Sequence, residues 1–186
     1  DHIGYGGIYS LDSDRMEKNK IHNGADDNAS GVALLLNLAE RVIEEDSSNN
    51  NYLFIAFSAE ELGLIGSKYF VEHPLINLEN ANYMINLDMV GRLNIKKELS
   101  IFGAGTSPIF KQIINSLNNS FSLKIIDDGT GPSDHTSFYN KGIPVLFFNS
   151  GSHQDYHRST DDFELINFDG IVEISNYVLD IINELN

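Results

Sequence analysis

The chain has 186 residues, a formal net charge of −15 and no cysteine. This length is enough for one hydrophobic core but too short for two ordinary domains, so we expect a single domain. Apolar residues make up 41% of the sequence and charged residues 21%, which is typical of a folded chain and not of a disordered one. The strong negative charge disfavours nucleic acid as a partner. The lack of cysteine excludes disulfides and thiolate metal sites.

Membrane-directed segments are not expected in this sequence. No run approaches the roughly 20 consecutive apolar residues that a membrane-spanning helix needs. The first residues do not form a basic region followed by an apolar one, as a signal peptide would. We therefore predict no membrane partner, and the composition alone leaves the cellular compartment open.

The first half of the chain contains three predicted elements. After a polar, glycine-containing loop at 10–24, apolar residues recur at helical spacing from Val32 to Ile43, which predicts an amphipathic helix. The run Tyr52–Phe57 is apolar and aromatic throughout and too short for an ordinary helix, so it predicts a buried strand. A second helix should begin near Ile65 and end near Pro74.

The second half continues the alternation of strands and helices. The expected elements are strands at Tyr83–Leu87 and Leu99–Phe102, a helix opened by Pro108, strands at Leu123–Ile126 and Pro144–Phe148, and a last helix over 171–182. Because parallel strands need crossover connections, this order predicts an α/β fold of three layers, with a mostly parallel central sheet and helices on both faces. Ligands of such sheets bind beyond the carboxyl ends of the strands.

Acidic residues and one histidine follow the predicted strands or precede the first helix. Asp27 lies just before that helix, Glu60 and Glu61 follow the strand at 52–57, Asp88 ends the next strand, and His157 lies in the loop after the last one. Any one carboxylate alone could simply cap a helix. Gathered at one edge, like charges would raise each other's pKa values steeply unless cations held them. The pattern therefore indicates a metal site.

The types of ligand narrow the choice of metal. Carboxylate and imidazole ligands without sulfur suit Zn²⁺ in catalytic sites, and also Mn²⁺ or Co²⁺. Two such ions about 3.5–4 Å apart form the usual arrangement for aminopeptidase hydrolysis. The types of ligand therefore predict a site for Zn²⁺, Mn²⁺ or Co²⁺.

Five segments resemble the successive signatures of the M28 zinc aminopeptidases, in the same order and over nearly the whole chain. They are Asn-Gly-Ala-Asp-Asp-Asn-Ala-Ser-Gly at 23–31, Ser-Ala-Glu-Glu-Leu-Gly-Leu-Ile-Gly-Ser at 58–67, Asn-Leu-Asp-Met at 86–89, Ser-Asp-His at 133–135 and Tyr-His at 156–157. The resemblance implies a zinc-dependent exopeptidase fold. It also implies that residues 1–186 form a single catalytic domain that lacks its N-terminal part, and it favours a secreted or periplasmic location.

The resemblance also implies roles for individual residues. Asp27 would bridge two Zn²⁺ ions, Glu61 and His157 would complete one metal site, and Asp88 would belong to the other. Glu60 would be the general base that takes a proton from the metal-bridging water and passes it to the leaving amine. A base must reach that water without being a ligand itself, which accounts for its position next to Glu61.

Two further residues are candidates with less definite roles. Tyr156 would either steady the developing oxyanion or pack against the pocket. Asp1 and His2 resemble the last two residues of a His-x-Asp-His element, whose first histidine would be a ligand of the second metal and is not in this sequence. Asp1 would support that histidine from behind. His2 could replace it as a ligand, although in the family geometry its side chain lies on the wrong side of Asp1.

The activity implied by the resemblance is removal of N-terminal residues from peptides with a free amine. Asp88 and Glu60 would lie near that amine. Met89, Phe147, Phe148 and the segment 129–133 would either shape a pocket that favours an apolar first residue or belong to the core. Two alternatives remain open. One is a glutaminyl cyclase-like acyltransferase with a single zinc ion, and the other is an inactive M28-like domain that serves binding.

Overall fold

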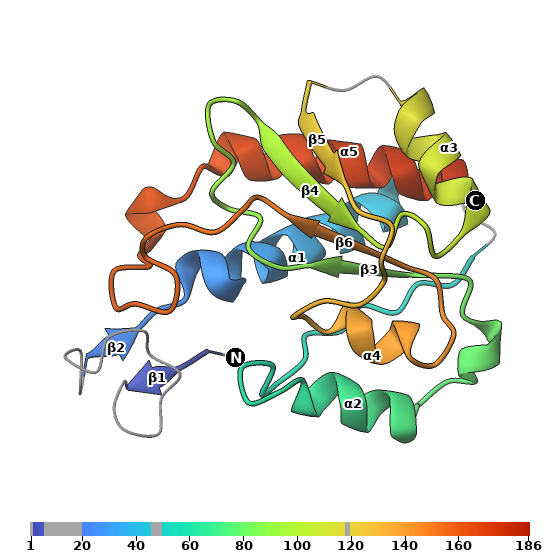
Figure 1. Ribbon diagram of the computed structural model, residues 1–186, viewed down its shortest axis with the longest axis horizontal. Helices are drawn as coiled ribbons and strands as arrows, with labels where there is room; N and C mark the ends of the chain where they lie inside the picture. Colours follow the sequence, from blue (N-terminus) through green and yellow to red (C-terminus); the bar gives the residue numbers. More distant parts are fainter. Residues whose placement is uncertain (1, 6–19, 46–49, 118–119) are drawn as a thin grey trace.

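A four-stranded sheet forms the centre of the computed structural model, which describes residues 2–5, 20–45, 50–117 and 120–186 (Figure 1). The strand order is β3–β6–β4–β5. β3 pairs with β6 in parallel, β4 pairs with β5 in parallel, and β4 pairs with β6 antiparallel. The sheet is thus mixed and more parallel than antiparallel, and the predicted α/β class is confirmed. The strand bounds are β3 Met84–Leu87, β4 Glu98–Phe102, β5 Ser122–Ile125 and β6 Val145–Asn149.

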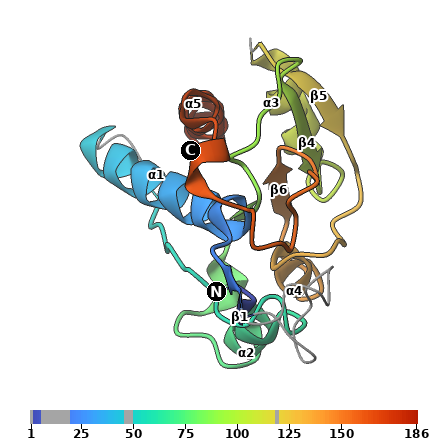
Figure 2. The same ribbon diagram turned by 90° about the vertical axis from the view of Figure 1, so that its left-hand side faces the viewer.

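Helices cover both faces of this sheet. Figure 2 shows α1 and α5 on one side of the sheet and α4 on the other, with α2 beside α4. The predicted three layers are therefore present. The helices are α1 Gly31–Glu45, α2 Ile65–Glu72, α3 Pro108–Ser116, α4 His135–Tyr139 and α5 Phe168–Leu185. Two short strands, β1 Gly4–Tyr5 and β2 Ile21–His22, pair antiparallel apart from the central sheet.

Two hydrophobic cores separate the layers because neighbouring residues of a strand point to opposite faces. From β6, Leu146 and Phe148 enter the larger core with residues of α1, α3 and α5. Val145 enters the smaller core, where it meets Phe138 of α4 and Val71 of α2. A strand that is apolar on both faces is what a sheet covered by helices on both sides requires.

The predicted buried strand at Tyr52–Phe57 is wrong. None of its residues is buried, Leu53 is 51% exposed, and the segment pairs with no strand in the described part of the chain. Ile55 and Phe57 instead line a cavity of about 100 Å³ together with residues of β3. Apolar composition favours burial, but a strand also needs a neighbour to accept and donate its backbone hydrogen bonds, and composition does not report that neighbour.

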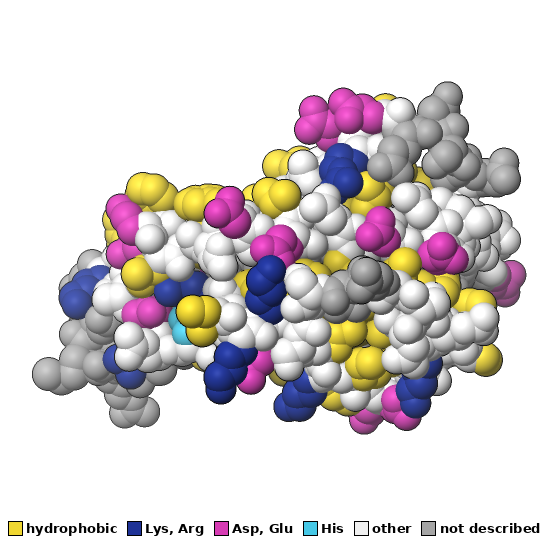
Figure 3. Space-filling view, turned by 90° about the horizontal axis from the view of Figure 1, so that it is seen from above, with side chains coloured by type: hydrophobic (Ala, Val, Ile, Leu, Met, Phe, Trp, Pro, Cys, Tyr) yellow, Lys and Arg dark blue, Asp and Glu magenta, His cyan; other side chains and the backbone are white. Residues whose placement is uncertain are grey.

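The exposed surface carries charges of both signs. On the face in Figure 3, acidic side chains are scattered among basic and hydrophobic ones and do not gather in one patch. In the described residues no helix combines the length and the apolar composition needed to cross a bilayer.

The topology brings the candidate residues to one edge of the sheet. β3 and β6 are parallel, so their carboxyl ends lie at the same edge. Asp88 follows β3 directly, and the loop after β6 leads to His157. Asp27 lies in the turn Ala25–Ser30, which ends where α1 begins.

Gly103, which follows β4 and lies beside the amino end of β6, offers a test of how tightly the opposite edge of the sheet is packed. Gly103 and Gly142 have nearly the same φ, of +80° and +81°. A Cβ at Gly103 would overlap the carbonyl oxygen of Val145, whereas nothing lies within 4 Å of a Cβ at Gly142. We expect Gly142→Ala to lower the free energy of unfolding by about 1–2 kcal/mol from backbone strain alone. Gly103→Ala should lower it by more than about 3 kcal/mol.

Urea unfolding of the two variants measures this difference directly. Because the φ values are matched, the excess loss in Gly103→Ala reports mainly the close approach to Val145 of β6. Equal losses in the two variants would contradict the described packing of Gly103 against Val145.

Candidate metal centre

Asp27, Glu61 and His157 come from three distant segments and meet at one point. Nε2 of His157 lies 2.9 Å from Oε2 of Glu61 and 3.3 Å from Oδ2 of Asp27. Burial lowers the pKa of His157, but its interactions with the two carboxylates outweigh this and raise the pKa to about 10. Two carboxylates that converge on one imidazole are the donors that a zinc ion takes.

His2 joins this cluster from the other side. Its Nδ1 lies 3.0 Å from Oε1 of Glu61, and its ring meets that of His157 edge to face with the centroids 6.0 Å apart. One ligand atom from each of His2, Asp27 and Glu61 lies within 4.8 Å of the others. Nε2 of His2 is buried without a hydrogen-bond partner. The described residues thus place His2 where a metal ligand could lie, whereas Asp1 lies outside them.

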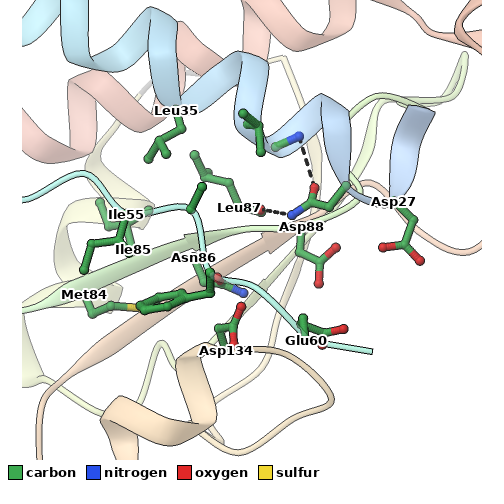
Figure 4. A pocket seen from close by; sticks show the side chains of 15 residues that line it. Asp27, Leu35, Ile55, Glu60, Met84, Ile85, Asn86, Leu87, Asp88 and Asp134 are labelled. Carbon is green, nitrogen blue, oxygen red and sulfur yellow. Dashed lines mark hydrogen bonds between the residues drawn. The ribbon is translucent and has the colours of Figure 1, made fainter. Parts of the chain in front are cut away.

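Asp88 forms the opposite wall of the site. Its Oδ2 accepts a hydrogen bond of 2.7 Å from Oγ of Ser133, and its Oδ1 is buried without a partner. Burial, followed by the charge of Asp27, raises the pKa of Asp88 to about 7. In Figure 4, Asp27, Asp88 and Glu60 extend toward the same side of the pocket. A buried carboxylate oxygen without a partner fits a ligand of a cation.

Glu60 and Glu61 are neighbours in sequence but have opposite surroundings. Burial, followed by the charges of Asp88 and Glu61, raises the pKa of Glu60 to about 8. Burial also raises the pKa of Glu61, but hydrogen bonds with His157 and His2 outweigh it and lower the pKa to about 2. Glu61 is therefore held as a carboxylate among imidazoles, while Glu60 remains a carboxyl group with affinity for a proton.

The backbone is strained at three positions around these groups. Ala59, Met89 and His157 have φ of 56°, 56° and 57°, in the left-handed region that residues other than glycine rarely adopt. Ala59 precedes Glu60, Met89 follows Asp88, and His157 is itself a candidate ligand. Strain of this kind costs roughly 1–2 kcal/mol per residue and persists mainly at functional sites.

A buried ion pair fixes the backbone that carries Asp27. Asp161 is fully buried, and its Oδ2 accepts hydrogen bonds from the backbone N–H groups of Asp26 at 2.9 Å and Asp27 at 3.1 Å. Nη2 of Arg92 lies 3.3 Å from Oδ1 of Asp161 and 3.1 Å from Asp155. Sequence reasoning missed this group. The only hint of this group in the sequence is that Asp161 lies four residues after His157, in the same polar loop.

Asp26 anchors the same turn from a different direction. Its Oδ1 accepts hydrogen bonds from the N–H of Gly91 at 2.6 Å and from Oγ of Ser30 at 3.0 Å. His153 lies 3.1 Å from its other oxygen. The side chain is fully buried, so these contacts compensate a charge that would otherwise be costly. The turn before α1 is thereby tied to the loop after β3.

An open cleft of about 580 Å³ lies in front of the carboxylates. Tyr156 lines it, and its ring stacks on that of His157 with the centroids 3.9 Å apart. Burial and the surrounding carboxylates raise the pKa of Tyr156, so its phenol stays protonated and can donate a hydrogen bond. The apolar part of the cleft consists of Leu64, Met89, Phe102, Pro132 and Phe147. Phe148 does not line it, because it points to the core on the other face of the sheet.

The fold and the donor set are those of a metal-dependent peptidase. The sequence pattern of Peptidase family M28 matches residues 1–182, and the chain belongs to this family.

Two curated relatives support this assignment. Aminopeptidase YwaD from Bacillus subtilis is 31% identical over 167 residues, which cover 83% of this chain and 36% of that protein. Leupeptin-inactivating enzyme 1 from Streptomyces exfoliatus is 34% identical over 140 residues, covering 73% of this chain and 31% of that protein. The chain therefore spans about a third of the length of these relatives.

Solved structures agree with the family. The zinc aminopeptidase BSAP from Bacillus subtilis has a TM-score of 0.75 and 30% identity, covering 88% of this chain and 43% of that one. A glutaminyl cyclase from Porphyromonas gingivalis has a TM-score of 0.68 at 19% identity, which shows a shared fold alone.

The pKa shifts predict how the stability of the metal-free chain depends on pH. The raised pKa values of Glu60, about 8, and Asp88, about 7, mean that folding becomes less favourable as pH rises above their unfolded values. The raised pKa of His157, about 10, adds a loss above its unfolded value of 6.5. Glu61, with a pKa near 2, changes charge only at lower pH. We therefore expect the melting temperature of the metal-free chain to fall between about pH 5 and pH 8.

This pH dependence is tested by measuring the melting temperature between about pH 5 and pH 8 at constant ionic strength, once with a chelator and once with Zn²⁺. Bound cations compensate the carboxylates, so Zn²⁺ should raise the melting temperature most at the higher pH. Glu60→Gln should flatten the profile of the metal-free chain. A metal-free melting temperature that rises over the same range would contradict the described crowding of carboxylates.

Proposed function

We propose that the protein carrying this chain is a zinc-dependent aminopeptidase that uses Glu60 as its general base. The observation that carries the proposal is the contrast between Glu60 and Glu61. Adjacent carboxyl groups whose surroundings push their pKa values to about 8 and about 2 are suited to different tasks. The group with the raised pKa suits proton transfer near neutral pH, and the group held as a carboxylate suits metal binding.

The residues that would hold the metals follow from the geometry of the site. Asp27, Glu61 and His157 converge within hydrogen-bond range and would hold one ion. Asp88, with a buried oxygen that has no partner, would hold the other together with Asp27. When bound, the two ions polarise the scissile carbonyl and lower the pKa of the attacking water.

The side chains of the cleft would perform the proton transfer and the recognition. Glu60 would take a proton from the attacking water and pass it to the amine that leaves. In the described residues no hydrogen bond occupies its carboxyl group, so it is available for this transfer. The phenol of Tyr156 is protonated, lines the same cleft and would donate to the developing oxyanion.

The substrate would be the free N-terminus of a peptide. The acidic groups Glu60 and Asp88 line the cleft beside its apolar part, and a cationic α-amine would be attracted to them. The side chain of the first residue would lie against Met89, Phe102 and Phe147, which favours an apolar residue.

Replacement of the base tests the mechanism. We expect Glu60→Gln to lower kcat by about 10²–10⁴-fold, because Gln has nearly the same shape but cannot take a proton. Metal content should remain that of the unmodified protein, since Glu60 is not proposed as a ligand. Activity on an aminoacyl anilide and metal analysis of the same sample provide the two measurements.

Two further variants give this test its controls. Glu61→Gln should lose metal and activity together, because it removes a proposed ligand. Glu79→Gln, at an exposed position of the short helical turn Leu78–Asn80, should change neither. Loss of metal in Glu60→Gln would show that the roles of the two glutamates are reversed.

A pair of substrates tests recognition of the amine. The protein should cleave a leucine anilide with a free amine and should cleave its N-acetylated form at least about 100-fold more slowly, since acetylation removes the charge that the carboxylates attract. Equal rates would indicate an endopeptidase or another hydrolase. Formation of pyroglutamate from an N-terminal glutamine, without release of amino acids, would support a glutaminyl cyclase instead.

A further inference from the structure

The side chain of Asn28 connects the two halves of the candidate metal centre. Its Nδ2 donates a hydrogen bond of 2.9 Å to the carbonyl oxygen of Leu87. Its Oδ1 accepts two hydrogen bonds, from the N–H of Gly31 at 3.1 Å and from the N–H of Met89 at 3.2 Å. Figure 4 draws the hydrogen bond to Leu87 as a dashed line. The amide thus contacts the residues on both sides of Asp88, while its own backbone follows Asp27.

The packing around this amide leaves little room for another arrangement. A Cβ at Gly31 would overlap both Oδ1 of Asn28 and the carbonyl oxygen of Leu87. The first residue of α1 therefore lies directly against β3, with the amide beside it. Both lone pairs of Oδ1 and one N–H of the amide are in use, so the side chain is held at three points.

The chain contains a second amide with nearly the same local bonds. At the start of α5, Nδ2 of Asn167 donates to the carbonyl oxygen of Leu93 at 2.8 Å, and its Oδ1 accepts from the N–H of Gly170 at 2.9 Å. Both asparagines precede a glycine by three residues and tie the beginning of a helix to another segment. The bond to Met89 and the position between two candidate ligands distinguish Asn28.

We propose that Asn28 is a positioning residue that sets the distance between Asp27 and Asp88, and so the spacing of the two metal ions. This inference rests on the proposed assignment of Asp27 as the shared ligand and Asp88 as a ligand of the second ion. Asp27 and Asp88 are like charges in a buried cleft and repel each other when no cation is present. A neutral amide that bonds to the backbone on both sides of Asp88 resists that repulsion without adding charge.

We expect Asn28→Ala to lower selectively the affinity of the protein for the second metal ion. The first ion keeps all its proposed ligands, Asp27, Glu61 and His157. For the second ion, the distance between its proposed ligands Asp27 and Asp88 is no longer fixed. Loss of an outer support of a ligand typically lowers metal affinity about 10–100-fold, and we expect a decrease of that size for the second ion. Titration of the metal-free protein with Zn²⁺, followed calorimetrically, measures the two affinities separately.

Asn167→Ala is the matched control, because it removes the same kind of bonds at the start of a helix that carries no candidate ligand. It should lower the melting temperature of the metal-free protein as Asn28→Ala does, but leave both zinc affinities unchanged. The absorption spectrum of the cobalt-substituted protein adds a readout of ligand geometry that a general loss of stability would not move. Only the Asn28 variant should alter it.

Asn28→Asp completes the set, since its carboxylate can still accept from Gly31 and Met89 but cannot donate to the carbonyl oxygen of Leu87 and adds a negative charge beside Asp27. It should therefore also lower the second zinc affinity relative to the first, and it keeps the proposal testable should the alanine variant not fold. Two zinc affinities unchanged in Asn28→Ala, or lowered equally in Asn28→Ala and Asn167→Ala, would overturn the inference. Failure of the unmodified protein to bind zinc would instead overturn the proposed function, so the two failures are distinguishable.

Discussion

Repulsion among carboxylates is the constraint on which the rest of the site depends. Asp27, Glu60, Glu61 and Asp88 line one cleft at the edge of the sheet. In a buried place, like charges cannot all remain ionised without compensation. The site compensates them unequally: imidazoles surround Glu61, a single hydroxyl reaches Asp88, and Glu60 has no such partner. That inequality produces one carboxyl group suited to bind a proton next to others suited to bind a cation.

The backbone around the site is fixed by polar groups that do not face the cleft. Asp161 holds the N–H groups of the turn before α1, and Arg92 compensates its buried charge. Asn28 ties the same turn to the end of β3. The left-handed conformation of Met89, beside Asp88, persists where its N–H is held by Asn28. A preorganised site thus depends on residues that carry no chemistry of their own.

Prediction from the sequence succeeded for elements whose pattern of apolar residues alone determines their structure. The helical spacing from Val32 to Ile43 matches α1, and the apolar run before Asn149 matches β6. The run at Tyr52–Phe57 failed because strand formation needs a partner as well as apolar composition. α4 was missed because five residues are too few to show a periodic pattern.

The candidate site was predictable to a similar extent. Carboxylates at the ends of strands could be placed near one another from the order of elements, and the structure brings Asp27, Glu60, Glu61 and Asp88 together. His2 and Asn28 could not be assigned contacts in this way. Their contacts arise from the packing of a turn against a strand and from a pairing across 59 residues, which spacing along the chain does not encode.

The segment at 52–57 has a consequence for the behaviour of the chain in solution. β3 is an end strand of the sheet, and the apolar segment beside it takes part in no ladder of the described residues while Leu53 and Phe54 remain exposed. Backbone N–H and C=O groups that no neighbouring strand pairs with can form hydrogen bonds with another extended chain. Self-association at high concentration would therefore begin at this margin of the sheet.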